Sequence, residues 1–176
     1  LQGAVSMIGK IKDLRELFEV ELRYAYDCEQ KLVNKGLPSM IESASSPELR
    51  SALQHHLGET RGHVSRLEGI FRAIGAEPKT NDNAVIDKLL SAAKDSIGHT
   101  EESPLRDTAL IANGNVVEHY EIALYGTLAS YARALGLRDV VTPLDQILAE
   151  EKAADAKLTQ LSETSMNGKA ARFTTA

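Results

Sequence analysis

The helical nature of this chain is clearest in residues 46–75, which read SPELRSALQHHLGETRGHVSRLEGIFRAIG. Ser46 offers a side-chain acceptor at the N-cap, and Pro47 follows at the first helical position, where no N–H is needed. Gly75 stands where a left-handed residue would end the helix. Apolar residues recur between these points at intervals of three and four, which predicts one long amphipathic helix over residues 47–74.

Three other stretches show comparable start signals, a hydroxyl or carboxyl side chain followed by a proline or a glutamate. They predict helices over about residues 12–44, 104–135 and 143–165. Pro38 lies inside the first of these helices and should kink or split it, because proline has no N–H and crowds the preceding turn. The last helix should begin at Pro143, with Thr142 as its N-cap.

The lengths of the connections predict how these four helices are arranged. Short turns join the first helix to the second and the third to the fourth, so each pair forms an antiparallel hairpin. Residues 76–103 connect the two hairpins and contain a short amphipathic helix over about residues 83–97. We expect an all-α, ferritin-like four-helix bundle with one long crossover. It should form a single domain over residues 1–168, followed by a flexible tail over residues 169–176.

Composition and charge exclude several classes of protein. The chain has 176 residues and a single cysteine, Cys28, so an intrachain disulfide and a cysteine-based zinc or iron–sulfur site are excluded. A net charge of −5 and the lack of a basic run argue against nucleic-acid binding. No stretch reaches the roughly 20 apolar residues of a membrane span, and residues 1–9 lack the basic region and cleavage site of a signal peptide. We therefore expect a cytoplasmic protein without a nucleic-acid or membrane partner.

At a helical rotation of about 100° per residue, one glutamate in each predicted helix falls on or at the edge of the apolar stripe and should point toward the core. These four residues are Glu29, Glu59, Glu121 and Glu151. One such residue alone could lie at the bundle edge with its charge in solvent. Four together are harder to explain in this way, because an unpaired buried carboxylate costs several kcal/mol. His56 and His63 flank Glu59, and carboxylates with one or two imidazoles suit iron or manganese. The pattern predicts a dinuclear metal site in the bundle core.

The expected heights of these glutamates along the bundle agree only in part. The first two lie about 24 and 21 Å from their shared turn, at about 1.5 Å per residue. Glu121 lies about 21 Å from the end of its helix and Glu151 about 12 Å from the start of the next. The loop over residues 136–142 would have to span this mismatch of about 9 Å. Glu150 would also be level, but it points about 100° away from the apolar stripe.

Five segments resemble the bacterial YciE/YciF-like stress-response family, a branch of the ferritin-like superfamily. They are LRYAYDCEQKL (22–32), SPEL (46–49), HLGET (56–60), VEHYEIALYG (117–126) and EEKAAD (150–155). The segments occur in order along nearly the whole chain. The resemblance implies a ferritin-like bundle that is commonly a homodimer and is tied to general or oxidative stress. It implies no defined activity.

The chain departs from the wider di-iron pattern, in which two helices carry one glutamate each and two carry Glu-x-x-His. Gly62 stands three residues after Glu59, and Ala154 stands three residues after Glu151. The nearby alternatives are His63 and Asp155, four residues after Glu59 and Glu151, and His56, three residues before Glu59. One imidazole with an extra carboxylate would make a site richer in oxygen ligands than the usual di-iron centre.

The candidate metal ligands are therefore a set of acids and histidines from all four helices. They are Glu29, Glu59, His63, Glu121, Glu151, His56, Glu118 and Asp155. Glu118 is either a further ligand or an acid that contacts the ligands. Tyr125, one turn from Glu121, could hydrogen-bond a ligand. Cys28 neighbours Glu29, but a lone cysteine in a helix usually serves packing.

Two functions from different classes fit this pattern. The first is a di-metal carboxylate protein, with iron or manganese, that handles peroxide, oxygen or ferrous iron. The second is a structural, oligomeric stress protein in which the acids are a remnant of a metal site. A mini-ferritin that coats DNA is disfavoured, because the chain is acidic and has no lysine-rich arm.

Overall fold

The computed structural model describes residues 9–101 and 104–173, which form helices and no strand. Seven α-helices and two π-helical turns follow one another along the chain. They are α1 (Leu14–Lys31), η1 (Leu32–Gly36), α2 (Leu37–Ser43), α3 (Pro47–Ala73), α4 (Ala84–Gly98), α5 (Pro104–Ala134), α6 (Arg138–Leu161), η2 (Ser162–Met166) and α7 (Asn167–Ala171).

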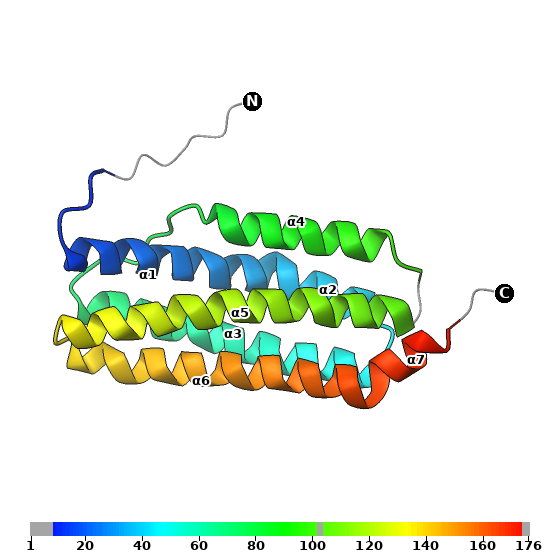
Figure 1. Cartoon of the computed structure of the whole chain (residues 1–176). Coiled ribbons are helices and arrows are strands. Elements are labelled where there is room, and N and C mark those ends of the chain that lie inside the picture. Colours follow the sequence, from blue (N-terminus) through cyan, green and yellow to red (C-terminus); the bar gives the residue numbers. More distant parts are fainter. Residues whose placement is uncertain (1–8, 102–103, 174–176) are drawn as a thin grey trace, which may run out of the picture.

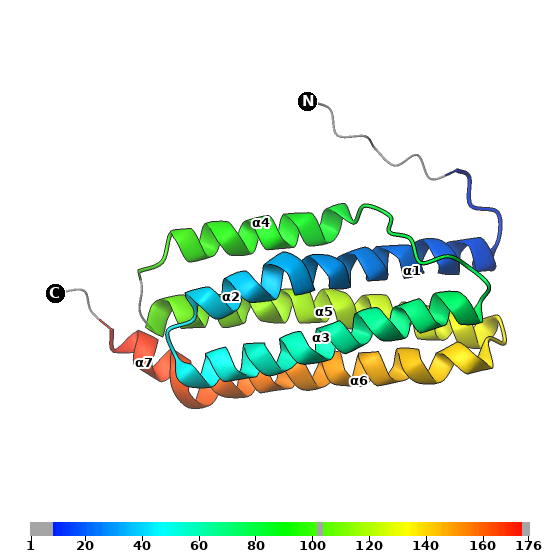
Figure 2. The same cartoon turned by 180° about the vertical axis from the view of Figure 1, so that it is seen from behind.

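Four long helical segments lie side by side and form a bundle (Figures 1 and 2). The first segment is α1–η1–α2, the second is α3, the third is α5, and the fourth is α6 continued by η2 and α7. The connection from α3 to α5 runs the length of the bundle, and its helix α4 lies on the outside, beside α1–α2 and α5. This confirms the predicted all-α four-helix bundle with one long crossover that contains a short helix.

The start and stop signals of the sequence act as predicted at several helix ends. The Ser46 hydroxyl accepts a hydrogen bond from the backbone N–H of Leu49 at 3.4 Å, and Asp13 caps α1 in the same way. Gly75 and Gly136 have φ angles of 74° and 68°, in the left-handed region that only glycine adopts without strain. At both glycines the next residue donates a backbone hydrogen bond to a carbonyl five residues earlier, which closes the helix.

The predicted start of the fourth helix at Pro143 is wrong. Helix α6 begins at Arg138, and Pro143 lies inside it. Leu137 and Val140 pack into the core, so burial of these apolar side chains outweighs the backbone hydrogen bond that Pro143 cannot donate. The earlier start also removes the expected mismatch in height. Glu151 lies 13 residues after the start of α6, and Glu121 lies 13 residues before the end of α5.

The predicted interruption near Pro38 takes the form of a π-helical turn. In η1 the N–H of Leu37 bonds to the carbonyl of Leu32, five residues earlier, so the helix continues through the proline without a break.

The fourth segment also extends beyond the predicted end at residue 165, to Ala171. Flexibility of the tail over residues 169–176 stays a prediction, and residues 1–8 and 174–176 lie outside the described part. No described helix is long and apolar enough to cross a membrane.

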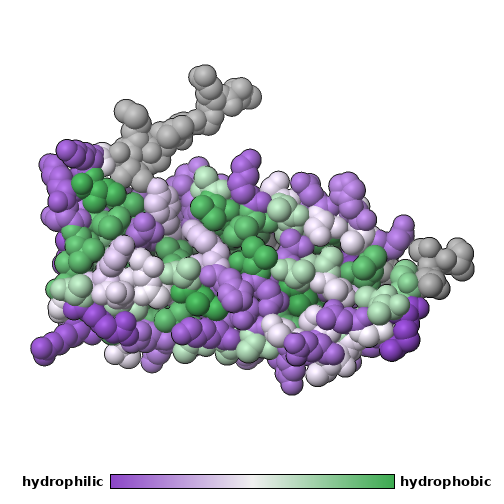
Figure 3. Space-filling model, viewed as in Figure 1, coloured by the Kyte–Doolittle hydropathy of each residue, from purple (hydrophilic) through white to green (hydrophobic). Residues whose placement is uncertain are grey.

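The bundle core consists of two clusters, one toward each end. The first, here called the aromatic half, is centred on Phe18, Leu67, Phe71, Tyr125 and Leu144. The second, here called the aliphatic half, contains no fully buried aromatic side chain among the described residues. It is centred on Leu32, Met40, Leu53, Val117 and Leu158. On the face that carries α4, α5 and α6, hydrophobic residues lie scattered among hydrophilic ones (Figure 3).

Candidate metal centre

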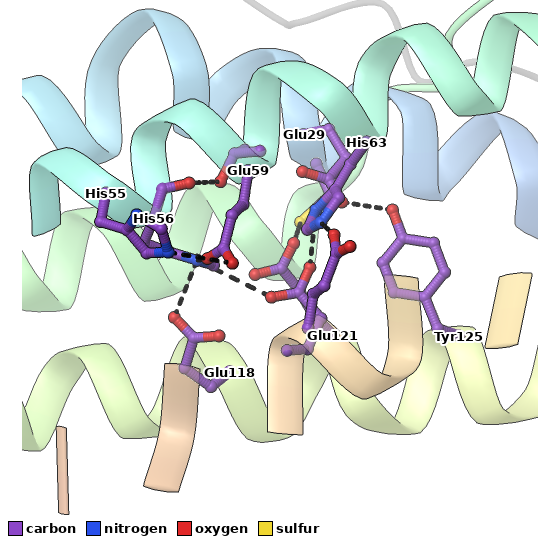
Figure 4. Close-up of polar contacts among 12 residues, drawn as sticks. Glu29, His55, His56, Glu59, His63, Glu118, Glu121 and Tyr125 are labelled. Atoms are coloured by element: carbon purple, nitrogen blue, oxygen red, sulfur yellow. Dashed lines mark hydrogen bonds and ion pairs between the residues drawn. The ribbon is translucent and has the colours of Figure 1, made fainter. Parts of the chain in front are cut away.

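Six buried acids and histidines meet in the core where the two halves join (Figure 4). All four segments of the bundle contribute to this set, here called the acid–histidine cluster. Its members are Glu29 on α1, His56 and His63 on α3, Glu118 and Glu121 on α5, and Glu151 on α6. Helical spacing predicted inward positions for three of them, Glu29, Glu121 and Glu151.

Glu29, His63 and Glu151 form the first of two groups within the cluster. Nδ1 of His63 lies 3.3 Å from Oε1 of Glu29 and 3.0 Å from Oε1 of Glu151. All three side chains are buried, and their ligand atoms lie within 4.8 Å of one another, a spacing at which they could hold one metal ion.

His56, Glu118 and Glu151 form the second group. Nε2 of His56 lies 3.2 Å from Oε1 of Glu118 and 3.7 Å from Oε2 of Glu151. These side chains are also buried and spaced so that they could hold a metal ion. Glu151 therefore belongs to both groups and directs one oxygen toward each.

Each histidine faces an outer carboxylate with its other ring nitrogen. Nε2 of His63 lies 2.8 Å from Oε2 of Glu150, which also accepts a hydrogen bond from Arg66 at 2.5 Å. Nδ1 of His56 lies 3.4 Å from Oε2 of Glu59. Carboxylates in such positions fix the tautomer and the orientation of a metal-binding imidazole.

The two outer carboxylates differ from the expectations of the sequence. Glu59 was expected to point inward with the other three glutamates, but its side chain is 28% exposed and lies outside both groups. Glu150 was expected to point away, but it contacts His63 from the α6 side with its side chain 34% exposed. Helical angles place an α-carbon well but not the end of a long side chain, so the two positions could not be told apart from the sequence.

Tyr125 and Cys28 complete the surroundings of the cluster. The Tyr125 hydroxyl donates a hydrogen bond to Oε1 of Glu29, so Tyr125 bonds a candidate ligand, though not the neighbouring Glu121 (Figure 4). The thiol of Cys28 donates to Oε1 of Glu121 at 3.7 Å. Sequence reasoning missed the contact of Cys28, because nothing in the helical pattern separates a packing cysteine from one beside an acid.

Asp155 lies apart from the two groups. Its Oδ1 accepts a hydrogen bond from the Asn115 side chain at 2.8 Å and lies 3.4 Å from Nε2 of the exposed His119. Asp155, which the sequence suggested as an extra oxygen ligand, therefore contacts Asn115 and His119 of α5 and not the cluster. Glu118 occupies the corresponding place in the second group.

Many polar atoms of the cluster lack a hydrogen-bond partner. Among the described residues, these buried atoms are Oε2 of Glu29, Nδ1 of His63, Oε2 of Glu118, Oε2 of Glu121 and both side-chain oxygens of Glu151. Buried polar atoms without partners are rare, because each costs free energy comparable to a lost hydrogen bond. Carboxylate oxygens and imidazole nitrogens are suitable donors for iron or manganese. The residues present therefore fit a metal ion as the missing partner.

Burial and mutual repulsion shift the pKa values of the acids upward. Burial raises the pKa of Glu121 well above its ordinary value, and the charges of Glu151 and Glu29 raise it further. Burial, with a smaller effect of a neighbouring carboxylate, also raises the pKa values of Glu29 and Glu151. Without a cation, part of this set would therefore be protonated at neutral pH.

The same carboxylates hold protons on the histidines. Burial lowers the pKa of His63, but the adjacent carboxylates of Glu151 and Glu29 outweigh it and raise this pKa to about 10. The pKa of His56 is also raised well above its ordinary value, because contacts with Glu118 and Glu59 outweigh the effect of burial. A metal ion would have to displace these protons, so metal binding here competes with protonation.

Comparisons with known proteins agree with the resemblance noted from the sequence. The model of a domain of unknown function, DUF892, matches residues 13–171. YciF of Escherichia coli strain K12 is 36% identical over 161 residues, which cover 91% of this chain and 96% of YciF. The crystal structure of this stress protein matches with a TM-score of 0.86 over 90% of this chain and 100% of that chain.

A second solved structure has a similar degree of likeness. YcfI from Rhodopseudomonas palustris, whose name proposes a structural role for it, is 39% identical. The match has a TM-score of 0.82 and covers 85% of this chain and 95% of that chain.

Proposed function

This chain belongs to the YciF-like DUF892 family, and we propose that it binds two metal ions, iron or manganese, in the acid–histidine cluster. One ion would lie among Glu29, His63 and Glu151, and the other among His56, Glu118 and Glu151. When bound, such a pair of ions supplies redox and Lewis-acid chemistry for oxygen, peroxide or ferrous iron. The protein is then a ferritin-like, di-metal carboxylate protein of the stress response.

The observation that carries this proposal is the set of buried oxygens without partners around Glu151. Both side-chain oxygens of Glu151 are buried and accept no well-aligned hydrogen bond, although Oε1 lies 3.0 Å from Nδ1 of His63 and Oε2 lies 3.7 Å from Nε2 of His56. A structural buried glutamate would be expected to accept hydrogen bonds from nearby donors. A carboxylate that bridges two cations needs no such donors.

The chain's own residues would orient the ligands and hold the protons around such a centre. Glu150 and Glu59 face the outer nitrogens of His63 and His56 and would accept their N–H hydrogen bonds. Metal would displace the protons that the histidines hold in the metal-free protein, and the inner nitrogens would then be available as ligands. Tyr125 donates to Glu29 and keeps its proton within the core, where burial raises the pKa of its hydroxyl well above the ordinary value.

The test is the metal content of protein purified without chelator, measured by elemental analysis. We expect two iron or manganese ions per chain. Glu151→Gln should lose most of this metal, because it removes the shared ligand, whereas Glu163→Gln on the exposed surface should retain it. A metal content near zero in the unaltered protein, before and after incubation with Fe²⁺ and Mn²⁺, would contradict the proposal.

A structural role without catalysis is the second candidate. The similar protein YcfI favours this candidate. It is 39% identical to this chain, and its name proposes a structural role for it. In this case the acids are a remnant, and assembly is the function. The chain should then form a homodimer or larger oligomer whose stability does not change on addition of metal, which light scattering and thermal unfolding would show. A cytoplasmic location stays a prediction in both cases.

A further inference from the structure

A cavity of about 1300 Å³ lies in the aliphatic half of the bundle and reaches the acid–histidine cluster. His56, Glu118 and Glu121 line it at the cluster, and Leu53, Val117 and Leu158 are among the residues that line it farther along. Drug-sized ligands occupy pockets of roughly 300–1,000 Å³. Oxygen, peroxide and metal ions do not need a space of this size, so the cavity has room for an organic molecule.

The lining has the chemistry of a site for an aliphatic chain. Among the described residues, its buried part contains leucine, valine and methionine side chains and no phenylalanine, tyrosine or tryptophan. The exposed side chains along it are mostly charged or polar, among them Lys35, Asp87, Lys94 and Lys157. Apart from the imidazoles of His55 and His56, the described lining offers no aromatic surface on which a ring could stack. Gly114 and Ala93 are buried and line the cavity with little or no side chain. Met40 adds a flexible apolar side chain that adapts to differently shaped ligands.

Polar groups without partners lie at the inner end of this cavity. Oε2 of Glu118 and Oε2 of Glu121 are buried and accept no hydrogen bond from the described residues. Both glutamates line the cavity as well as belonging to the cluster. An apolar space that ends at such atoms fits a ligand with one polar end and one long apolar part.

The backbone is also irregular around the cavity. Leu32, Lys35 and Gly36 of the π-helical turn η1 line it, and η2 begins directly after the lining residue Leu161. The aromatic half contains no π-helical turn among the described residues. Single π-helical turns inside α-helices occur frequently at functional sites, because the extra residue displaces the side chains that follow.

We propose that the cavity binds a fatty acid, a single aliphatic chain with a carboxylate head. The head lies at the acid–histidine cluster, and the chain extends between α2, α3 and α5. This inference rests on the proposed metal centre. Without metal, Glu118 and Glu121 would repel a carboxylate head, whereas two divalent cations would attract it. Aliphatic contacts bind the chain in both states, so the metal should affect only the head.

The test compares two probes that share a chain and differ in the head, decanoate and decan-1-ol. Calorimetric titration would measure their binding to metal-free protein and to protein loaded with Mn²⁺. We expect one molecule of either probe per chain. Mn²⁺ should strengthen the binding of decanoate about tenfold or more, as for a new contact between charged groups. Binding of decan-1-ol should stay within about twofold, because its head carries no charge.

Two neighbouring valines on α5 provide a matched pair of variants. Val117 lines the cavity and is 6% exposed, whereas Val116 is 52% exposed on the outside of the helix. Val117→Phe should fill the cavity and weaken both probes about tenfold or more, while Val116→Phe should leave them unchanged. Ala52→Leu, at a half-buried lining position, serves as a second filling variant if Val117→Phe does not fold.

The outcomes separate this inference from the proposed metal centre. If neither probe binds at a saturable site, or if Val117→Phe and Ala52→Leu bind both probes as well as the unaltered protein, the cavity is not a binding site. If both probes bind and Mn²⁺ is present at two ions per chain but does not strengthen decanoate, the placement of the head is wrong. If the protein holds no metal although decan-1-ol binds, the proposed metal centre fails and the aliphatic site remains.

Discussion

The two halves of the bundle contain the same four helical segments but differ in how their interiors are filled. The aromatic half is closed by large side chains such as Phe18, Phe71 and Tyr125, which are fully buried. The aliphatic half contains a cavity of about 1300 Å³ and both π-helical turns. The acid–histidine cluster lies where the halves join. Tight packing thus lies in the aromatic half of the bundle, and space for a ligand lies in the aliphatic half.

This separation also explains the surroundings of the cluster. On the aromatic side, Tyr125 closes the core and donates a hydrogen bond to Glu29. On the aliphatic side, Glu118 and Glu121 line the cavity, and nothing described bonds to their Oε2 atoms. Four predictions test the contrast, in order of decreasing effect on the free energy of unfolding, taken per substitution, per saturating metal or per pH unit.

The largest effect should come from a leucine in the closed core. Leu67→Ala in the aromatic half should destabilise the protein by about 4 kcal/mol, because a tightly packed surrounding cannot collapse into the new space. The same change at Leu53, which lines the existing cavity, should cost about 2 kcal/mol, near the low end for such substitutions. Urea unfolding measures both values. Equal losses would mean that the two halves are packed alike.

Metal should stabilise the protein through the cluster. A ligand that binds only the folded state adds about 2.7 kcal/mol when it is present at 100 times its Kd. Fe²⁺ or Mn²⁺ should therefore raise the melting temperature of chelated protein, and thermal scans with and without metal measure this shift. His63→Gln should remove most of the gain, whereas His119→Gln, on the exposed outside of α5, should retain it. A gain of the same size in both variants would place the metal elsewhere.

Stability of the metal-free protein should decrease as the pH rises from about 6.5 to about 10. The pKa of His63 is raised to about 10 in the folded protein, whereas an unfolded histidine titrates near pH 6.5. The folded state thus holds a proton that the unfolded state has lost, and His63 alone lowers stability by at most about 1.4 kcal/mol per pH unit.

The metal-loaded protein provides the contrast to this pH dependence. Metal binding requires the proton to leave His63, so the stability gained from Mn²⁺ should grow with pH over the range in which the metal stays soluble. The stability of the metal-loaded protein itself should change little above about pH 6.5, because neither its folded nor its unfolded state then holds this proton. Urea unfolding at a series of pH values, with chelator and with Mn²⁺, measures both slopes. A metal-free slope of zero would show that the carboxylates around His63 do not hold its proton.

The smallest effect should come from a single charge in the cluster. Burial and the neighbouring acids raise the pKa of Glu121, so ionisation of this residue opposes folding at neutral pH. Glu121→Gln should stabilise metal-free protein by about 1 kcal/mol and at the same time weaken metal binding. Glu163→Gln on the surface should change stability by less than about 0.5 kcal/mol. Loss of stability in Glu121→Gln without metal would contradict the repulsion among the buried acids.

Much of the fold follows from the sequence because helix ends are local. Ser46, Pro47, Gly75 and Gly136 act on the backbone within one turn, and the structure has them at helix ends as predicted. The exception is Pro143, which looks like a start signal but lies inside α6. The apolar residues around Leu137 and Val140 decide the helix start there through contacts with distant parts of the chain, which no local pattern contains.

The sequence by itself determined which residues face the core, because helical spacing assigns each α-carbon to a face. It identified Glu29, Glu121 and Glu151 as inward acids, and all three are buried. Only the tertiary structure decided how their ends meet: that Glu151 lies between the two histidines, and that Glu59 and Glu150 lie outside them. The position of the cavity was likewise decided by packing, since volume left between helices depends on all of their side chains at once.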